Sequence, residues 1–329
     1  MWILIVPILL PLLMIAGIVC LVIGAWIIGT FFILIAFFLN ERTQTFAYKG
    51  LFRSKQCLSS SRTLKVLNYN VNNWHYFEYK GESAIDAFIN FLKQENADII
   101  CFEEHTFIER YDIENRLKEI YPYTSGQHDV YSKYPIANHR KICLSDDDIR
   151  IKSFPDFLRL VGPNWREMPI WTMEVDVNGF MVHLIDCYMM TNNFNRVKYD
   201  LEGESYWNRY LLTPLKIYTY IRFGYKARAL GAEVLRKEID RFDGPTIILG
   251  DFNDLSGSYC LRNVMGTSLQ NAWWRCGLGF GFTFCTQGMR WRLDHVLCST
   301  EFDVKDVRIP LIPFSDHYPV VADLKFISD

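Results

Sequence analysis

The chain has 329 residues, 35 basic and 37 acidic side chains, and a formal net charge of −2 at pH 7. This balance argues against a protein that coats nucleic acid over its whole surface, although it leaves room for a local basic groove. The nine cysteines are odd in number, and several lie in apolar segments where free thiols pack as small hydrophobes, which argues against a disulfide scaffold.

The first 39 residues contain no charged side chain, whereas the chain from Asn40 onward has an ordinary mixture. As one helix this segment would be about 58 Å long, against a membrane hydrocarbon core of roughly 30 Å. We therefore expect a membrane anchor over residues 1–39, formed by two helices, residues 2–23 and 26–39, that turn around Gly24. A signal peptide fits less well, because the start has no positive charge and no small-residue cleavage site.

Residues 40–62 are expected to be a flexible linker beside the membrane. They carry one acid, Glu41, and a set of basic residues: Arg42, Lys49, Arg53, Lys55 and Arg62. Basic residues next to an anchor favour a cytoplasmic location of the domain that follows. The same charges could instead contact anionic lipid in a solvated linker.

Residues 63–329 show the pattern of one folded domain. Apolar runs typical of strands lie at residues 63–71, 97–105, 171–177, 180–190, 244–254, 292–299 and 317–326. Helical stretches lie at residues 84–95, 113–120 and 226–242, and no internal repeat or low-complexity tract is present. Many strands with interspersed helices predict a layered α/β architecture, in which two sheets pack face to face with helices outside.

Polar residues recur where these strands begin or end. The set is Asn70, Glu104, Asp251, Asn253, Asp294, Asp316 and His317. Each one alone has an ordinary explanation as a turn residue, a solvated acid or a structural histidine. Together, in repeated strand-end positions, they indicate a functional site on a rigid sheet.

The residue types indicate the chemistry. Acid and amide oxygens are hard ligands, and no His/Cys cluster has zinc spacing, so the expected metal is Mg²⁺ or Mn²⁺. A histidine with an aspartate partner can act as a general base or as a hydrogen-bond donor in the transition state. A metal that polarises phosphoryl oxygens would complete a site for phosphate ester hydrolysis.

Five motifs resemble one known family. In chain order they are NYNVNN, DIICFEEH, GDFND, RLDHVL and SDHYPV. They resemble the endonuclease/exonuclease/phosphatase superfamily, which includes DNase I-like nucleases, apurinic endonucleases, inositol polyphosphate phosphatases and bacterial-type sphingomyelinases. The resemblance covers about residues 64–324 and implies a four-layer DNase I-like sandwich. The hydrophobic N-terminus ahead of the domain is similar to that of membrane-anchored bacterial members.

The resemblance also implies roles for the strand-end residues. Glu104 would be the main metal ligand, with Asn70 and Asp316 near the same ion. Asp251 would position or activate the attacking water, and Asn253 would hold the phosphate or the water. Asp294 would orient His317, which would face the phosphate.

Two positions depart from the family pattern. The family often has Gln before the metal-binding Glu, and here the residue is Glu103, which we expect to face away from the site because side chains alternate along a strand. Many family members have a histidine after a middle strand, and this chain has Tyr188 at that position. Tyr188 is either a candidate hydrogen-bond donor to phosphate or a packed core residue. Arg292, two residues before Asp294, could bind phosphate or form a surface salt bridge.

Residues 191–225 form an insertion that interleaves cations with aromatic residues. The cations are Arg196, Lys198, Arg209, Lys216 and Arg222, and the aromatic residues are Tyr206, Trp207, Tyr210, Tyr218, Tyr220 and Phe223. Such a mixture could stack nucleobases, lie at a bilayer interface, or form an amphipathic helix packed on the domain. Beside a membrane anchor, we favour the bilayer interface over nucleic acid.

The sequence thus predicts a monomeric, membrane-anchored phosphoesterase that requires Mg²⁺ or Mn²⁺ and acts on a phospholipid or lipid-linked phosphate. One alternative is a Mg²⁺-dependent nuclease acting on DNA. Another is a membrane-tethered binding protein that has lost turnover. Membrane lipids are the expected partners, and nucleic acid is a possible partner that we do not favour.

Overall fold

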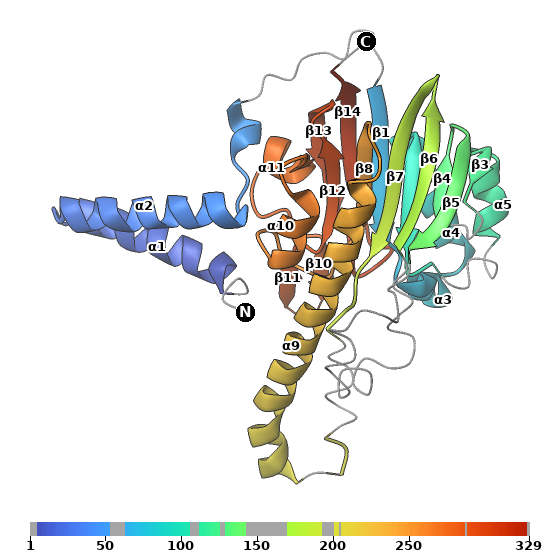
Figure 1. Ribbon diagram of the computed structural model, residues 1–329. Coiled ribbons are helices and arrows are strands. Elements are labelled where there is room, and N and C mark those ends of the chain that lie inside the picture. Colours follow the sequence, from blue (N-terminus) through green and yellow to red (C-terminus); the bar gives the residue numbers. More distant parts are fainter. Residues whose placement is uncertain are drawn as a thin grey trace.

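A computed structural model describes residues 5–52, 63–105, 112–125, 129–142, 170–192, 201–203, 205–286 and 288–327. Two six-stranded sheets form its centre (Figure 1). The first has the order β13-β14-β1-β2-β4-β3 and consists of β1 (Thr63–Asn70), β2 (Ile99–Glu103), β3 (Tyr123–Thr124), β4 (Val130–Ser132), β13 (Phe302–Arg308) and β14 (Val320–Phe326). The second has the order β5-β6-β7-β8-β12-β9 and consists of β5 (Ile136–Ile142), β6 (Ile170–Val177), β7 (Phe180–Tyr188), β8 (Thr246–Asp251), β9 (Leu269–Asn271) and β12 (Asp294–Ser299).

The main core lies between the two sheets. Val66 and Ile99 of the first sheet belong to the same buried cluster as Leu184, Ile247 and Val296 of the second. Side chains alternate along a strand, so every second residue of each strand enters this core while the others face the outer layers.

Helices cover the outer face of each sheet. On the first sheet lie α3 (His75–Lys80), α4 (Glu82–Glu95) and α5 (Ile113–Lys118), whose apolar side chains share a buried cluster with Leu67 and Phe102. On the second lie α9 (Tyr206–Ile239) and α10 (Tyr259–Met265), which share a cluster with Ile185 and Ile248. The chain therefore forms the α/β sandwich of helix, sheet, sheet and helix that the sequence predicts.

The strand directions bring several strand ends to one edge. β1 runs parallel to β2, with Asn70 opposite Glu103, and β7 runs parallel to β8, with Tyr188 opposite Asp251. β12 is antiparallel to β8, so its first residue, Asp294, also lies opposite Asp251. Polar residues at these positions meet because parallel neighbours end together while an antiparallel neighbour begins there.

The helix expected at residues 226–242 is much longer than predicted. It begins at Tyr206, where the side chain of Ser205 accepts a hydrogen bond from the backbone N–H of Asn208 at 3.3 Å. This cap starts the helix inside the insertion, and Pro214 does not end it. Most of the described insertion is therefore helical.

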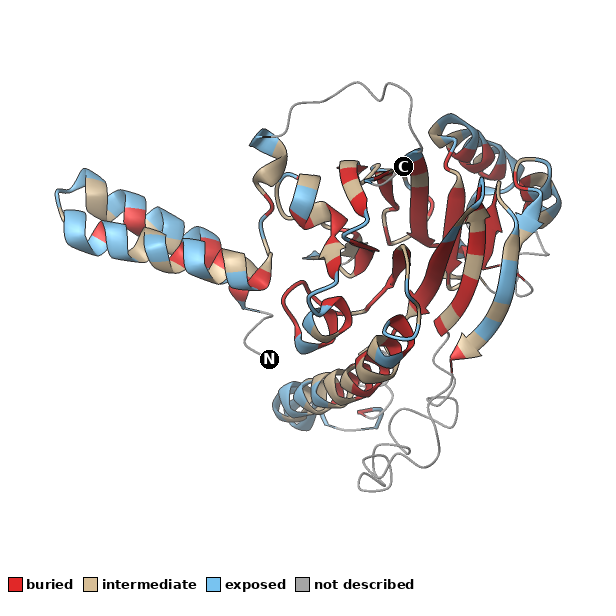
Figure 2. Cartoon of the chain, turned by 45° about the horizontal axis from the view of Figure 1, so that its top comes forward, coloured by how far each residue is buried: buried red, intermediate tan, exposed pale blue. Residues whose placement is uncertain are grey.

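The N-terminal apolar segment forms two helices, α1 (Val6–Val22) and α2 (Trp26–Thr43), which lie side by side in Figure 1. Gly24 joins them with a φ of +83°, a conformation that favours glycine. Val6, Leu10 and Ala36 pack between the helices, and many of the other apolar side chains are exposed, as the pale blue hairpin in Figure 2 shows. By length and composition α2, with 18 residues, could cross a membrane, whereas α1 is shorter.

The chain after α2 packs on the domain, so the described part of the expected linker is not free. Ala47 is buried and pairs through both of its backbone hydrogen bonds with Gly279. Tyr48 packs edge-on against Trp274 of α11 (Ala272–Cys276) with ring centroids 5.8 Å apart. A Cβ atom on Gly257 would lie 2.5 Å from Cα of Thr43, so only glycine permits this approach. The short helix η2 (Lys49–Phe52) follows, and residues 53–62 lie outside the described part.

Candidate active site

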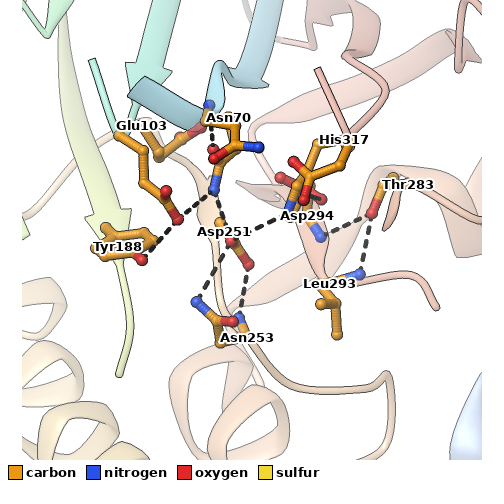
Figure 3. A network of polar contacts seen from close by, with 12 residues as sticks. Asn70, Glu103, Tyr188, Asp251, Asn253, Thr283, Leu293, Asp294 and His317 are labelled. Atoms are coloured by element: carbon orange, nitrogen blue, oxygen red, sulfur yellow. Dashed lines mark hydrogen bonds and ion pairs between the residues drawn. The ribbon is translucent and has the colours of Figure 1, made fainter. Parts of the chain in front are cut away.

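Side chains from both sheets converge at the edge where β1, β2, β7, β8 and β12 meet. Figure 3 shows them pointing toward one another from separate strands and loops: Asn70, Tyr188, Asp251, Asn253, Asp294 and His317. Four of these side chains are at most 5% exposed: Asn70, Asp251, Asp294 and His317. The fold brings these residues together from positions far apart in the chain, as expected for one site.

Asn70 connects the two sheets through its amide. Its Nδ2 donates to Oε1 of Glu104 at 3.1 Å and to Oδ2 of Asp251 at 3.0 Å, while its Oδ1 accepts from the backbone N–H of Asn72 at 2.9 Å. The amide group thus presents its nitrogen to both carboxylates. A half-turn of the amide would exchange the two atoms and direct Oδ1 at the site instead.

Glu104 receives three donors at the end of β2. Besides Asn70, its carboxylate accepts from Nδ2 of Asn73 at 3.3 Å and from the hydroxyl of Tyr188 at 2.7 Å. Burial, and then the charges of Glu104 and Asp251, raise the pKa of Tyr188 well above its usual range, so this hydroxyl keeps its proton. Tyr188 is predicted as a hydrogen-bond donor to phosphate. In the structure its hydroxyl donates to the carboxylate of Glu104, which could hold a metal.

Asp251 is fixed by the loop that follows it. Its Oδ1 accepts from the backbone N–H of Asn253 at 2.8 Å, and its Oδ2 accepts from Nδ2 of Asn253 at 3.3 Å. The same Nδ2 donates to the carbonyl of Met189 at 2.9 Å. Burial, followed by the charge of Asp294, raises the pKa of Asp251 to about 7, so this carboxylate can exchange a proton near neutral pH.

His317 and Asp294 form a close pair. His317 Nδ1 lies 2.8 Å from Oδ2 of Asp294, and His317 Nε2 lies 3.9 Å from Oδ2 of Asp251. Burial acts to lower the pKa of His317, but Asp294, Asp251 and Asp316 together raise it to about 10. The imidazole is therefore held in its charged form, with the Nε2 proton directed toward the Asp251 side of the site.

Asp316 lies beside this pair rather than in contact with the Glu104 group. Its carboxylate accepts a hydrogen bond from Ser315 Oγ at 3.3 Å, and its charge contributes to the raised pKa of His317. No hydrogen bond joins it to Asn70 or Glu104 in the described residues. Of the three predicted metal ligands, the structure brings Asn70 and Glu104 into contact and adds Asp251 to them through Asn70.

Glu103 lies in the core between the sheets, and no hydrogen bond joins it to Glu104, Asp251 or His317 in the described part of the chain. It is 2% exposed between the sheets and accepts a hydrogen bond from Nδ2 of Asn68 at 3.4 Å. The strand ends at Glu103, and Glu104 has a φ of +50°, so the alternation assumed for the two acids no longer applies. Burial, and then the charge of Asp186, raise the pKa of Glu103 well above its usual range, which favours its protonated form.

Within the described ranges, Arg292 forms no surface ion pair and no hydrogen bond to the acid cluster. Its guanidinium is buried and donates to Ser256 Oγ and to the carbonyls of Phe280 and Gln44. These partners lie in the loop after β8, the loop after α11, and the end of α2. Arg292 therefore braces the junction between the N-terminal hairpin and the domain.

Sequence reasoning passed over two supporting residues. Asn73 donates to Glu104, and it follows Asn72 in a run of left-handed backbone conformations with φ of +46° and +51°. Adjacent asparagines after a strand were the available signal, because asparagine tolerates this conformation. Thr283 Oγ1 accepts from the backbone N–H groups of Leu293 and Asp294 at 3.0 and 3.1 Å, and nothing in the sequence near Thr283 marks it.

Among the residues that the structure describes, His317 is the one cationic side chain in the acid cluster. In the described residues no lysine or arginine forms an ion pair with Glu104, Asp251 or Asp294. Geometry alone also permits a metal between Asp251, Asp294 and His317, whose ligand atoms lie within 4.8 Å of one another.

A family model described as the Endonuclease/Exonuclease/phosphatase family matches residues 68–317 of the chain. These residues span all of the candidate site from Asn70 to His317. A comparison with curated proteins finds no match.

Solved structures show the same fold at low sequence identity. A family protein from Bacteroides thetaiotaomicron is 17% identical, with a TM-score of 0.52 over 82% of this chain and 100% of that one. Sphingomyelinase C from Streptomyces griseocarneus is 16% identical, with a TM-score of 0.53 over 80% and 99%. D. rerio TDP2, complexed with a single-strand DNA product, is 12% identical, with a TM-score of 0.54 over 80% and 100%.

Proposed function

Because this chain belongs to the endonuclease/exonuclease/phosphatase family, whose members hydrolyse phosphoesters, we propose that it is a membrane-anchored, divalent-metal-dependent phosphoesterase that acts on a phospholipid or lipid-linked phosphate. Family membership makes it a hydrolase of phosphoesters, and it argues against a binding protein without turnover. The metal, the anchor and the substrate are the parts that we propose.

The acid cluster supports a divalent cation. Glu104 and Asp251 are linked through Asn70, and no lysine or arginine of the described chain forms an ion pair with either acid. We propose that Glu104 and Asn70 hold Mg²⁺ or Mn²⁺, with Asp316 as the third predicted ligand and Asn70 turned to offer Oδ1. The bound cation would polarise the phosphoryl oxygens and stabilise the leaving oxygen.

The remaining residues would move protons and hold the phosphate. Asp251, with a pKa of about 7, is suited to accept a proton from the attacking water. His317, with a pKa of about 10, is suited to donate its Nε2 proton as a hydrogen bond to a phosphoryl oxygen, while Asp294 holds Nδ1. Asn253 keeps Asp251 in place and would also hold the water or the phosphate.

The proposal of a lipid substrate rests on one observation: the end of the apolar hairpin docks on the loop that follows Asp251 and Asn253. Arg292 joins Gln44, at the end of α2, to Ser256 in the loop that follows Asp251 and Asn253. Arg292 is also two residues from Asp294. The active site would thus be held close to the bilayer that contains α2, where lipid substrates reach a high local concentration.

The test compares the full chain in liposomes with an anchorless variant that begins at Asn40 and so keeps the docked segment. We expect the full chain to hydrolyse phospholipids or lipid-linked phosphates faster, and the two forms to be equal on a small soluble phosphodiester. Equal rates of both forms on every lipid substrate would contradict the membrane part of the proposal. Absence of any phosphoester hydrolysis would contradict the whole.

The alternative function is a Mg²⁺-dependent nuclease. It is favoured by the basic and aromatic first half of α9, which could contact nucleic acid. An anchor gives no advantage on soluble DNA. If the anchorless variant cleaves single-stranded or abasic DNA far faster than the full chain cleaves any lipid, the nuclease is the correct assignment.

A further inference from the structure

The long helix α9 has two halves with different surroundings. Its second half packs on the second sheet, where Ala227, Ala232, Leu235 and Ile239 are buried in the core. Its first half extends beyond the domain, and Figure 2 shows it as largely exposed toward its start. At about 1.5 Å per residue the 34 residues of α9 span roughly 50 Å. The first half therefore forms an arm, which we define as residues 206–222.

Large apolar residues line one face of the arm. They are 46% to 72% exposed and are Trp207, Tyr210, Leu211, Leu215 and Tyr218. Their separations of three or four residues place them on one side of the helix. The other side of the arm is used for packing, because Leu212 and Ile217 contact the buried pair Leu201 and Tyr220. The exposed face is thus a continuous apolar surface.

The charged residues of the arm all have one sign. They are Arg209, Lys216 and Arg222, and the arm contains no acidic residue. Aromatic and aliphatic side chains flanked by cations are typical of helices that lie in the headgroup region of a membrane. A second copy of the arm would place like charges together. Leu211 and Leu215, at the centre of the face, cannot stack on nucleobases as aromatic rings do.

The arm lies on the side of the domain from which the hairpin projects. In Figure 1 the hairpin projects to the left, and the start of α9 extends below the sheets on the left side of the view. The hairpin is held there by the pairing of Ala47 with Gly279 and by the bonds of Arg292. The bilayer that contains the hairpin is the apolar surface that the proposed anchoring brings to the domain.

We propose that the face formed by Trp207, Tyr210, Leu211, Leu215 and Tyr218 lies in the interface of the bilayer that α2 enters. The ligand of this face is an anionic lipid surface. With the hairpin and the arm both engaged, the domain has two points of attachment and a fixed orientation. The inference rests on the proposed membrane anchoring, and its test reports on the two contacts separately.

The test uses the full chain in liposomes of phosphatidylcholine and phosphatidylglycerol, with and without a brominated phosphatidylcholine that quenches nearby tryptophan. The contribution of each tryptophan is the difference between the wild type and a Trp→Phe variant. Trp207→Phe reports the arm and Trp26→Phe reports the anchor. Trp171→Phe is the matched control, because Trp171 lies in β6 and stacks on His139.

We expect the quenched fluorescence to include components from Trp26 and Trp207 but none from Trp171. The Trp207 component should shrink in Leu211→Ser/Leu215→Ser and when phosphatidylglycerol is left out. A quenched Trp26 with an unquenched Trp207 would overturn the contact of the arm and leave the anchor intact. If neither is quenched, both are wrong. A Trp207 whose fluorescence responds to single-stranded DNA or to dimer formation, but not to brominated lipid, would also overturn the proposal.

Discussion

The amide nitrogen of Asn70 lies 3.0 Å from Oδ2 of Asp251, across 181 positions of sequence and between the two sheets. Asn70 ends β1 of the first sheet, and Asp251 ends β8 of the second. The same amide nitrogen binds Glu104 at 3.1 Å. Asn70 therefore connects the predicted metal ligand Glu104 with Asp251, the residue predicted to activate water. Because the two acids come from different sheets, the geometry of the site depends on how the two sheets pack.

The pH dependence of hydrolysis should follow Asp251. Its carboxyl must be ionised to accept a proton, and burial with the charge of Asp294 raises its pKa to about 7. We expect kcat/KM to fall as the pH drops below about 7. Bound Mg²⁺ stabilises a nearby carboxylate, so this limb should move to lower pH as Mg²⁺ is added. A pH–rate profile at low and saturating Mg²⁺ measures it, and a limb that stays in place would contradict the role of Asp251.

His317 and Asp294 should act as a unit, since Nδ1 and Oδ2 are 2.8 Å apart. His317→Ala should lower kcat by about 100- to 10,000-fold, as expected for a group that transfers or donates a proton. Asp294→Asn should be less damaging, and the double variant should be little worse than His317→Ala. Steady-state kinetics of the three variants give the comparison. Penalties that multiply in the double variant would mean that the residues work separately.

Glu103→Gln should stabilise the protein above neutral pH. Burial raises the pKa of Glu103, so the folded state holds a proton that the unfolded state releases, and the free energy of unfolding falls as the pH rises above the ordinary pKa of Glu. A glutamine side chain has nearly the same shape and can form hydrogen bonds, but it has no carboxyl proton to release. We expect a gain on the order of 1 kcal/mol at pH 8 and a flatter pH dependence.

The measurement for Glu103 is thermal or denaturant unfolding of the full chain in detergent at several pH values. Glu301→Gln is the control, because Glu301 is exposed on the domain surface. Equal pH dependence in wild type and Glu103→Gln would show that Glu103 is ionised in the folded protein.

Much of the sandwich could be predicted because its central strands have strong apolar patterns. The strands that were missed lie largely at the edges, such as β5, of which only part is buried, and β13, whose pairing shifts register between Val304 and Asp306. Polar residues dominate an edge strand that faces solvent, so the alternation that marks a strand is weak there. The strand β14 begins at Val320, later than the expected 317, because Pro319 cannot donate to the ladder.

Residue type and strand-end position were enough to predict which residues form the site. They were not enough to predict how the side chains of these residues point. Whether Glu103 faces the core depends on where β2 ends and on the left-handed backbone of Glu104, which no local pattern indicates. The two bonds of the Asn70 amide likewise depend on the spacing of two sheets that are distant in sequence. The docking of residues 43–50 could not be predicted either, because the partners of this segment lie more than 200 residues later.

The central claim is that a divalent cation held through Glu104 performs phosphoester hydrolysis. Its most direct test is a titration of Mg²⁺ against the hydrolysis of a soluble phosphodiester by wild type and Glu104→Gln, each with an EDTA control. The account predicts no turnover in EDTA, and it predicts a metal affinity more than about 100-fold weaker in Glu104→Gln, since groups that merely support a ligand already contribute about 10- to 100-fold. Full turnover in EDTA, or an unchanged Mg²⁺ dependence in a folded Glu104→Gln, would contradict it.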